Sequence, residues 1–171
     1  MGWLRIAWWG LVAPLREAEP LIVHQAVVLG PDGVLLAQRS ELRGWELPGG
    51  AAQPEESGED AVRREVLEET GIRVEVEQRV AKYLRSGFRP HVAHIYRCRY
   101  QGGTARPSHE TPNVAWFAPG ELPSTLFPWF RGPLRDGLRP TGRVTVRRER
   151  QGLRAILAGA WIDLKTRWLR R

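Results

Sequence analysis

The stretch from 49 to 72, GGAAQPEESGEDAVRREVLEETGI, constrains the fold of this chain more than any other part of the sequence. Its residue types predict a loop followed by a helix. Ser57 stands where an N-cap residue belongs, and Asp60 follows three residues later, as in a capping box. From Glu59 the pattern is helical until Gly71, which occupies the position of a glycine that ends a helix.

The predicted helix carries a dense acidic face. At about 100° per residue, an arc of roughly 140° holds four charged residues, Arg64, Glu65, Glu68 and Glu69. Carboxylates three or four residues apart on a helix repel each other, and only Arg64 is close enough along the helix to relieve this repulsion. A hard divalent cation, which prefers oxygen ligands, would relieve it further. The pattern therefore indicates either a solvated acidic helix face or a metal site.

The spacing within this stretch favours the metal site. Gly50, Glu56 and the run REVLEETGI at 64–72 match every fixed position of the pattern GX5EX7REUXEEXGU, in which U is an aliphatic residue. This pattern is the Nudix box, and the sequence WELPGG that leads into it from Trp45 resembles the usual approach to the box. From about residue 21 to 138 the chain resembles a Nudix hydrolase. The resemblance implies an α/β fold, the Nudix-type α/β/α sandwich with a mixed β-sheet.

The resemblance also implies roles for the matched residues. Glu65, Glu68 and Glu69 are expected to be ligands of Mg²⁺ or Mn²⁺, and the carbonyl group of Gly50 is a candidate for a further ligand. Glu65 and Glu68 are also expected among the catalytic residues. Arg64 joins them as a residue that orients the glutamates by ion pairing rather than by touching substrate. Divalent ions neutralise phosphate oxygens and lower the pKa of a bound water, which hydrolysis of a pyrophosphate bond requires.

Residues outside the helix complete the candidate site. Family members usually add a glutamate from a later loop, often as general base. Glu110 is the best candidate for this base, because it precedes a strand-like run at 114–117, and a ligand role is the alternative. Glu56 is expected to be an outer ligand or to hold the loop before the helix. We group it with the other candidates for substrate binding, Arg39, Phe88 and Arg89.

These features predict a divalent-metal-dependent hydrolase. It would cleave the pyrophosphate bond of a nucleoside diphosphate linked to another group, by attack of water on phosphorus. The alternative is a nucleotide-sensing or RNA-binding regulator built on a Nudix domain, with the basic tail of the chain contacting nucleic acid. In either case the expected partner is a small nucleoside diphosphate derivative, and a homodimer is one assembly to consider.

Charge is distributed unevenly along the 171 residues, whose formal net charge is +7. The segment at 139–171 carries ten Lys and Arg residues against two Asp and Glu residues, and the rest of the chain is close to neutral. We therefore expect three parts: an apolar N-terminal segment at 1–20, a Nudix hydrolase domain at 21–138 and a basic C-terminal segment at 139–171.

The sequence also bears on where the protein works. Cys98 is the only cysteine, so an intrachain disulfide is impossible and a cytoplasmic setting is expected. The first twelve residues, MGWLRIAWWGLV, form an apolar run that is too short to span a bilayer. We expect this run to pack on the domain or on a partner, with a membrane-surface role as the alternative.

Near the C-terminus, residues 151–170 predict an amphipathic helix. Its large apolar residues recur four and three apart and share one stripe, namely Leu153, Leu157, Trp161, Leu164 and Trp168. One interpretation is that the two apolar ends of the chain pack together over the core or across a dimer. The other is a basic, tryptophan-bearing helix that lies on an anionic membrane surface or contacts nucleic acid.

The rest of the chain predicts strands joined by loops. Runs rich in β-branched residues or with alternating polarity predict strands at 21–29, 34–39, 72–80, 91–100 and 114–117. The glycine-rich stretch at 101–107 is expected to be a loop, and 131–138 a short helix. His91 and His94 are three apart, which places them on opposite faces of a strand and makes them a poor metal pair.

Overall fold

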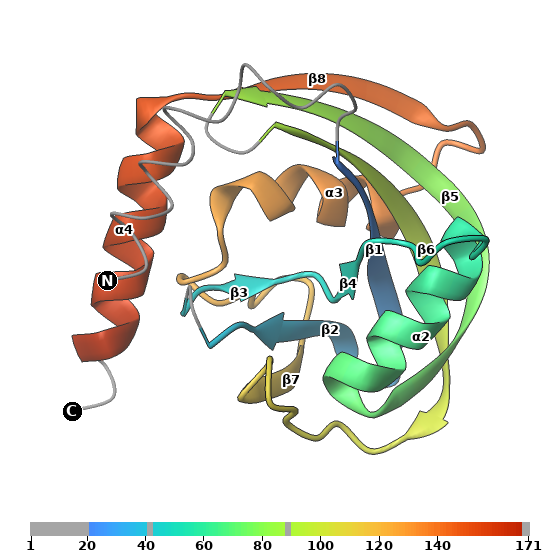
Figure 1. The fold of residues 1–171 in the computed structure, drawn as a ribbon. Coiled ribbons are helices and arrows are strands. Elements are labelled where there is room, and N and C mark those ends of the chain that lie inside the picture. The colour runs from blue at the N-terminus through green and yellow to red at the C-terminus, as the bar shows by residue number, and fades with distance from the viewer. Residues whose placement is uncertain (1–20, 41–42, 88–89, 169–171) are drawn as a thin grey trace.

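The computed structural model describes residues 21–40, 43–87 and 90–168. Within these residues the strands are β1 (Leu21–Gly30), β2 (Gly33–Gln38), β3 (Trp45–Glu46), β4 (Gly49–Gly50), β5 (Ile72–Gly87), β6 (His91–Gly103), β7 (Asn113–Phe117) and β8 (Thr145–Gln151). The helices are α2 (Gly58–Thr70), α3 (Pro128–Leu138) and α4 (Leu153–Trp168). Figure 1 shows these elements wrapped around one twisted sheet.

The sheet is mixed, as expected. Its strands follow the order β3-β2-β1-β6-β5-β8, with β4 paired to β1 and β7 paired to β2. Neighbours β1 and β6 run parallel, as do β5 and β8, whereas β5 and β6 form a long antiparallel pair. A mixed sheet of this kind arises where hairpins and helical crossovers occur in one chain.

Helices cover both faces of the sheet, which confirms the predicted α/β/α arrangement. Adjacent residues of β1 point to opposite faces, because side chains alternate along a strand. Val27 packs in a core with Phe130 and Leu134 of α3. On the other face, Val28 packs in a second core with Val62 of α2. The second core positions α2 over the middle of the sheet (Figure 1).

Several element limits differ from the sequence prediction. The strand expected at 72–80 continues to Gly87, and the strand expected at 91–100 continues to Gly103, so 101–103 is not a loop. Gly102 and Gly103 have φ of 145° and 96° and still pair with Arg73 and Ile72. Glycine can adopt such φ angles within a pair of hydrogen-bonded strands. The prediction of a loop from the Gly-Gly sequence therefore fails here.

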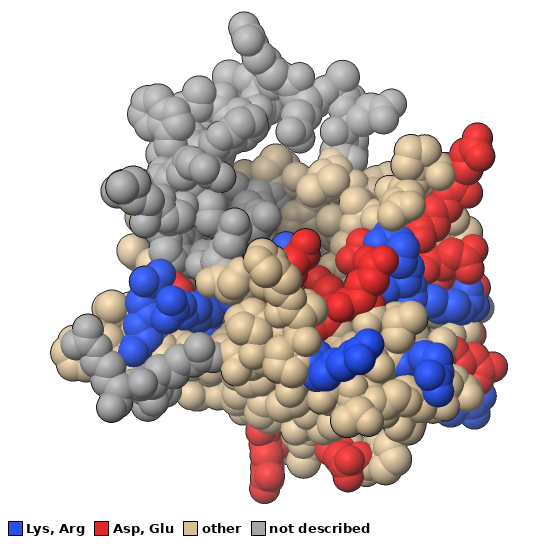
Figure 2. Space-filling model, turned by 60° about the horizontal axis from the view of Figure 1, so that its bottom comes forward, with Lys and Arg blue, Asp and Glu red and all other residues tan. Residues whose placement is uncertain are grey.

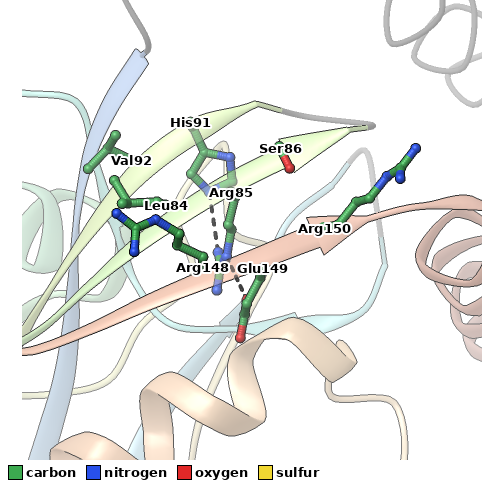
Figure 3. A pocket seen from close by; sticks show the side chains of 8 residues that line it. All are labelled: Leu84, Arg85, Ser86, His91, Val92, Arg148, Glu149 and Arg150. Carbon is green, nitrogen blue, oxygen red and sulfur yellow. Dashed lines mark hydrogen bonds and ion pairs between the residues drawn. The ribbon is translucent and has the colours of Figure 1, made fainter.

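Strand β8, which the sequence patterns do not predict, is held to the domain by arginine–carboxylate pairs. Nε and Nη2 of Arg147 each donate to the Asp136 carboxylate at 2.7 Å. The buried Arg85 lies between His91 and Glu149, as Figure 3 shows, with its Nε 3.3 Å from Oε2 of Glu149. These contacts join residues 145–151 to the same sheet as the rest of the domain.

Helix α4 forms where the C-terminal pattern predicts it, but its apolar stripe does not pack on the core. The residues that face the domain are Ile162, Asp163 and Thr166, with Gly159 beside them. The stripe that begins at Leu153 is exposed along its whole length. No described residue covers this stripe. The interpretation in which the two apolar ends pack together over the core or across a dimer stays a prediction, because the other apolar end, residues 1–20, lies outside the described residues.

None of the helices in the described ranges is long and apolar enough to cross a membrane. The two histidines of β6 lie on opposite faces of the sheet, as expected. His91 contacts Arg85 on one face, and His94 lies against His24 on the other, with ring centroids 5.3 Å apart. The histidines therefore do not form a metal pair with each other.

Candidate active site

The acidic helix is built by local rules that the sequence makes visible. Ser57 accepts a hydrogen bond from the backbone N–H of Asp60 at 3.2 Å, as an N-cap does. At the other end, Gly71 has φ of 74°, and its N–H donates to the carbonyl oxygen of Leu67. Both ends of α2 thus lie within one residue of the prediction.

The glycine pair of β4 brings the backbone close to this helix. Gly49 and Gly50 pair with Gln25 and His24 of β1. Gly49 has φ of 140°, and a Cβ there would collide with the His24 carbonyl group. A Cβ on Gly50 would lie 2.5 Å from the carboxyl carbon of Glu65, so any other residue would displace this carboxylate from its position.

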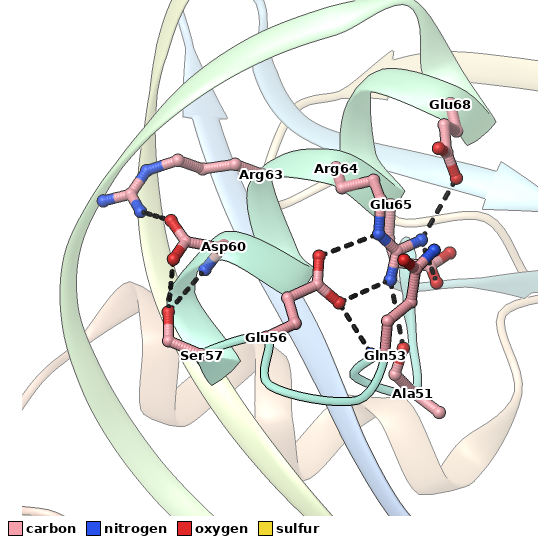
Figure 4. Close-up of polar contacts among 9 residues, drawn as sticks. All are labelled: Ala51, Gln53, Glu56, Ser57, Asp60, Arg63, Arg64, Glu65 and Glu68. Atoms are coloured by element: carbon pink, nitrogen blue, oxygen red, sulfur yellow. Dashed lines mark hydrogen bonds and ion pairs between the residues drawn. The ribbon is translucent and has the colours of Figure 1, made fainter.

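Arg64 links the helix to the loop before it, as Figure 4 shows. Its Nε and Nη2 donate to the two carboxylate oxygens of Glu56, at 2.8 and 2.9 Å. Its Nη1 lies 2.9 Å from Glu65 and 3.2 Å from Glu68. Hydrogen bonds from Arg64, and then from the Gln53 backbone, lower the pKa of Glu56 to about 2. One guanidinium therefore orders three carboxylates.

Glu69 is the buried carboxylate of the set. Its Oε2 accepts a hydrogen bond from the Gly49 N–H at 2.9 Å, and its Oε1 lies 3.5 Å from Nη2 of Arg39. Burial raises the pKa of Glu69 to about 8, although both of these partners act in the opposite direction. A carboxyl group in this environment ionises most readily when a cation is close.

Glu46 and Thr111, which were not among the predicted site residues, complete the surroundings of Glu69. Nε of Arg39 lies 2.6 Å from Oε1 of Glu46, so Arg39 lies between two carboxylates. Thr111 donates its hydroxyl to the backbone carbonyl of Glu69. The sequence signal for Glu46 is its place in WELPGG, directly before the glycine pair, whereas the Thr111 contact depends on tertiary folding.

Glu110 reaches the site from a separate loop. Its backbone carbonyl accepts a hydrogen bond from the Ser40 N–H at 3.0 Å. Ser108 and Thr111 brace the same loop, since their hydroxyl groups lie 2.8 Å apart. The resulting pocket has a volume of about 380 Å³ and is lined by Arg64, Glu65, Glu68, Glu69, Ser108 and Glu110. In Figure 2, acidic side chains gather near the centre of one face of the molecule, with basic side chains beside them.

The structure brings five of the predicted site residues together in this pocket, and three others, Gly50, Glu56 and Arg39, contact residues that line it. Gly50 lies next to the Glu65 carboxylate, and Glu56 accepts a hydrogen bond from Arg64. Arg39 lies on the far side of Glu69 and makes ion pairs with carboxylates. Phe88 and Arg89 fall outside the described residues.

The carboxylates provide the hard oxygen donors that Mg²⁺ prefers, but they do not converge on one point. In the part of the chain that the structure describes, no three His, Cys, Asp or Glu side chains are grouped closely enough to hold a metal ion. Arg64 holds Glu65 and Glu68 by ion pairs instead. The donor set fits a divalent ion in kind, and the glutamates would have to turn from Arg64 to bind one.

Comparisons with known proteins agree with this site. The family model of the NUDIX domain matches residues 22–137. The "MutT-like protein" of Streptomyces ambofaciens is 40% identical over 132 residues, which cover 74% of this chain and 85% of that protein. A "Putative 8-oxo-dGTP diphosphatase" of Bacillus subtilis is 33% identical over 125 residues, covering 72% and 83% respectively.

A solved structure also has this fold. The Nudix hydrolase from Nitrosomonas europaea is 23% identical and superposes with a TM-score of 0.67, over 78% of this chain and 82% of its own. The fold, the site and the family match lead to the same result. This chain belongs to the Nudix family of pyrophosphohydrolases.

Proposed function

We propose that the protein is a divalent-metal-dependent hydrolase that cleaves a pyrophosphate bond of a nucleoside diphosphate derivative by attack of water on phosphorus. The observation that carries this proposal is the pocket in which three glutamates of α2 meet Glu110 of a separate loop. A pocket lined by four carboxylates repels a polyphosphate by itself, so cations are needed for such a substrate to bind.

Nudix hydrolases generally use divalent metal ions. In this chain Glu65, Glu68 and Glu69 would hold the ion, with the carbonyl of Gly50 as a further ligand. The close approach of the Glu65 carboxylate to Gly50 supports this set, because it places a side-chain oxygen beside a backbone that carries no side chain. When bound, Mg²⁺ or Mn²⁺ neutralises phosphate oxygens and lowers the pKa of a water.

The residues around these ligands would hold them in position. The Gly49 N–H and Arg39 fix the two oxygens of Glu69, so this carboxylate has little freedom to turn. Arg64 balances the more exposed glutamates while the pocket is empty of substrate. We assign Glu110 as the base that accepts the proton of the attacking water, since it lines the pocket from a loop separate from the helix that carries the other carboxylates.

For the substrate, we propose a nucleoside triphosphate, in which the group linked to the diphosphate is a third phosphoryl group. The name of the Bacillus subtilis relative, 8-oxo-dGTP diphosphatase, indicates this class. Hydrolysis would yield a nucleoside monophosphate and pyrophosphate, with the oxygen of water in one of the two products. A cytoplasmic location suits this substrate, and the buried free thiol of Cys98 is compatible with a reducing compartment.

A substrate panel tests the proposal. The full chain is incubated with 8-oxo-dGTP, dGTP, CTP, ADP-ribose and a dinucleoside polyphosphate, each with Mg²⁺, with Mn²⁺ and with a chelator. We expect a triphosphate to be hydrolysed fastest, with pyrophosphate as the second product and no turnover in chelator. Water labelled with ¹⁸O then identifies which phosphorus is attacked.

Two outcomes would contradict the proposal in different ways. Fastest turnover of ADP-ribose would overturn the substrate class and leave the hydrolase assignment in place. Binding of nucleotide without turnover of any compound would overturn the hydrolase assignment and favour the sensor. A filter-binding assay with short RNA, run with and without residues 139–171, separates an RNA-binding regulator from a small-molecule sensor.

A further inference from the structure

Helix α4 presents an apolar face that nothing in the described residues covers. Its five large apolar side chains remain largely exposed: Leu153 at 69%, Leu157 at 60%, Trp161 at 65%, Leu164 at 48% and Trp168 at 75%. At about 100° per residue they fall within an arc of roughly 80°, along a length of about 22 Å. Contiguous apolar surface of this kind, unlike a single exposed leucine, indicates a contact site. We call this face the α4 stripe.

The α4 stripe cannot turn inward, because the opposite side of the helix is already fixed. Ile162 belongs to the main core of the domain. The buried carboxylate of Asp163 accepts a hydrogen bond from the Arg43 N–H at 3.3 Å, and Nζ of Lys165 donates to Ser124 at 3.0 Å. The exposure of the stripe is therefore a property of the docked helix.

Strand register locates the start of β1 at the end of the sheet where α4 begins. Leu21 pairs with His91, His91 pairs with Arg85, and Arg85 pairs with Glu149. Three strand spacings separate Leu21 from Glu149, which is about 14 Å. Because β8 ends two residues after Glu149 and leads directly into α4, Leu21 lies at the same end of the sheet as the first turn of this helix.

The segment that precedes β1 has the chemistry to cover an apolar face. Residues 3–12, WLRIAWWGLV, contain three tryptophans and four large aliphatic residues, with Arg5 as the single charge. The linking residues 13–20 span up to about 26 Å when extended, which exceeds the distance across the strands. Leu21 and Ile22, at the point where this segment joins β1, are themselves apolar and half exposed.

We propose that residues 3–12 of this chain dock on the α4 stripe. Two observations favour this occupant over a second copy of the chain. The segment is apolar like the stripe, and strand register places the start of β1 and the start of α4 at the same end of the sheet. An anionic membrane fits less well, because two of the three cations of α4 are engaged within the protein. Lys165 bonds to Ser124, and Nε of Arg167 lies 2.9 Å from Asp163.

Photo-crosslinking in the full chain tests the proposal. A benzoylphenylalanine replaces Trp161 in the stripe, and a matched control carries it at Val146, which is equally exposed on β8. We expect benzoylphenylalanine at position 161 to capture the tryptic peptide 6–16 within one chain. The crosslinking yield should be at least ten times that of the control at position 146. Mixing ¹⁴N- and ¹⁵N-labelled protein distinguishes capture within a chain from capture between chains.

A second measurement uses variants without the photoreactive group. Trp161→Glu should increase the rate of trypsin cleavage after Arg5 at least tenfold, whereas Val146→Glu should leave it unchanged. Crosslinks between the α4 helices of two chains would overturn the proposal in favour of self-association. Capture of phosphatidylserine vesicles by the full chain, with no crosslink to residues 6–16, would overturn it in favour of a membrane surface, and no crosslink at all would also overturn it.

Discussion

Two of the arginines that pair with carboxylates in this molecule, Arg64 and Arg147, differ in how their charge is balanced. On α2, Arg64 pairs with Glu56 and also with Glu65 and Glu68, which line an open pocket. On β8, Arg147 donates twice to the single buried carboxylate of Asp136, which also accepts a hydrogen bond from Tyr83 at 2.7 Å.

The difference shows which charges serve chemistry and which serve the fold. At Arg147 the cation pairs with a single carboxylate, which Arg135 also approaches at 3.9 Å. No negative charge is therefore left unbalanced, and the pair with Arg147 fastens β8 to α3. At Arg64 one cation meets three anions, with Glu69 and Glu110 close by in the same pocket. A surplus of negative charge destabilises a fold unless a ligand neutralises it. The excess of negative charge in the pocket therefore indicates the functional site, whereas the balanced pair of Arg147 and Asp136 stabilises the fold.

The largest expected effect is on turnover, and it tests whether the excess negative charge of the pocket supports the chemistry. Glu65→Gln removes one charged oxygen donor without changing the size of the side chain. We expect kcat with the best substrate to fall roughly a hundredfold to a thousandfold, because transition-state charge loses its neutralisation. The melting temperature should stay within a few degrees of that of the original protein. Steady-state kinetics and calorimetry measure the two quantities.

Glu59→Gln is the matched control for that variant. Glu59 lies on the same helix, but it pairs only loosely with Arg63 at 3.5 Å and is well exposed. Its substitution should change kcat less than twofold. An equal loss of activity in both variants would show that the charge of the helix as a whole, rather than the pocket, supports turnover.

Glu69→Gln should stabilise the metal-free protein in a pH-dependent manner. The ordinary pKa of this carboxyl is 4.5, and burial raises it to about 8 in the folded state. The folded protein therefore binds the proton more tightly, and stability is lost as the pH rises from 4.5 to 8. Glutamine carries no charge and avoids this loss, which is on the order of 3 kcal/mol at pH 7.

Urea unfolding with a chelator at pH 5 and at pH 8 measures this effect. The two proteins should be similar in stability at pH 5, and the variant should be more stable at pH 8. Activity should be lost in the variant at either pH. This is expected where a residue that is needed for activity destabilises the fold. A variant that is less stable at pH 8 would mean that Arg39 and the Gly49 N–H compensate the charge of Glu69 more than burial penalises it.

Arg147→Ala should affect the fold and not the chemistry. It removes the two short contacts of the Asp136 carboxylate, which is only 8% exposed, and leaves Arg135 at 3.9 Å as its remaining ion pair. We expect a loss of about 2 kcal/mol in the free energy of unfolding, below the usual value for a buried pair because solvent reaches the Arg147 side chain. Arg148→Ala is the control, since that side chain lies on the exposed face of the same strand. A large fall in kcat in Arg147→Ala would contradict the separation of scaffold and site.

The sequence predicted the helix of the site almost to the residue, because local rules determine it. Ser57 caps its start and Gly71 ends it, and both signals act within a few residues along the chain. The Nudix box then indicated which glutamates share a face. By contrast, the position of Glu46 beside Arg39 depends on the pairing of β3 with β2, which no local pattern encodes.

The C-terminal part shows a different limit of sequence patterns. Strand β8 has the sequence TVRRERQ, which is typical of a charged and exposed segment. It forms a strand where it pairs in parallel with β5, and Asp136 and Arg85 are partners for its charged side chains. Periodicity correctly placed the apolar residues of α4 on one stripe. It could not tell which face of α4 turns inward, because the buried face is marked by Ile162 and small or polar residues rather than by a hydrophobic run.

The smallest expected effect separates the local from the tertiary contribution to α2. Ser57→Ala removes the side-chain oxygen that caps the helix and should cost about 1 kcal/mol of stability. Turnover should be unchanged, because Glu65 and Glu69 are positioned a turn or more away by Gly50 and Gly49 rather than by the cap. Chemical denaturation and kcat are measured on the same preparation. If kcat falls with stability, the start of the helix positions the glutamates as well, and the contrast between local folding and tertiary placement of the site no longer holds.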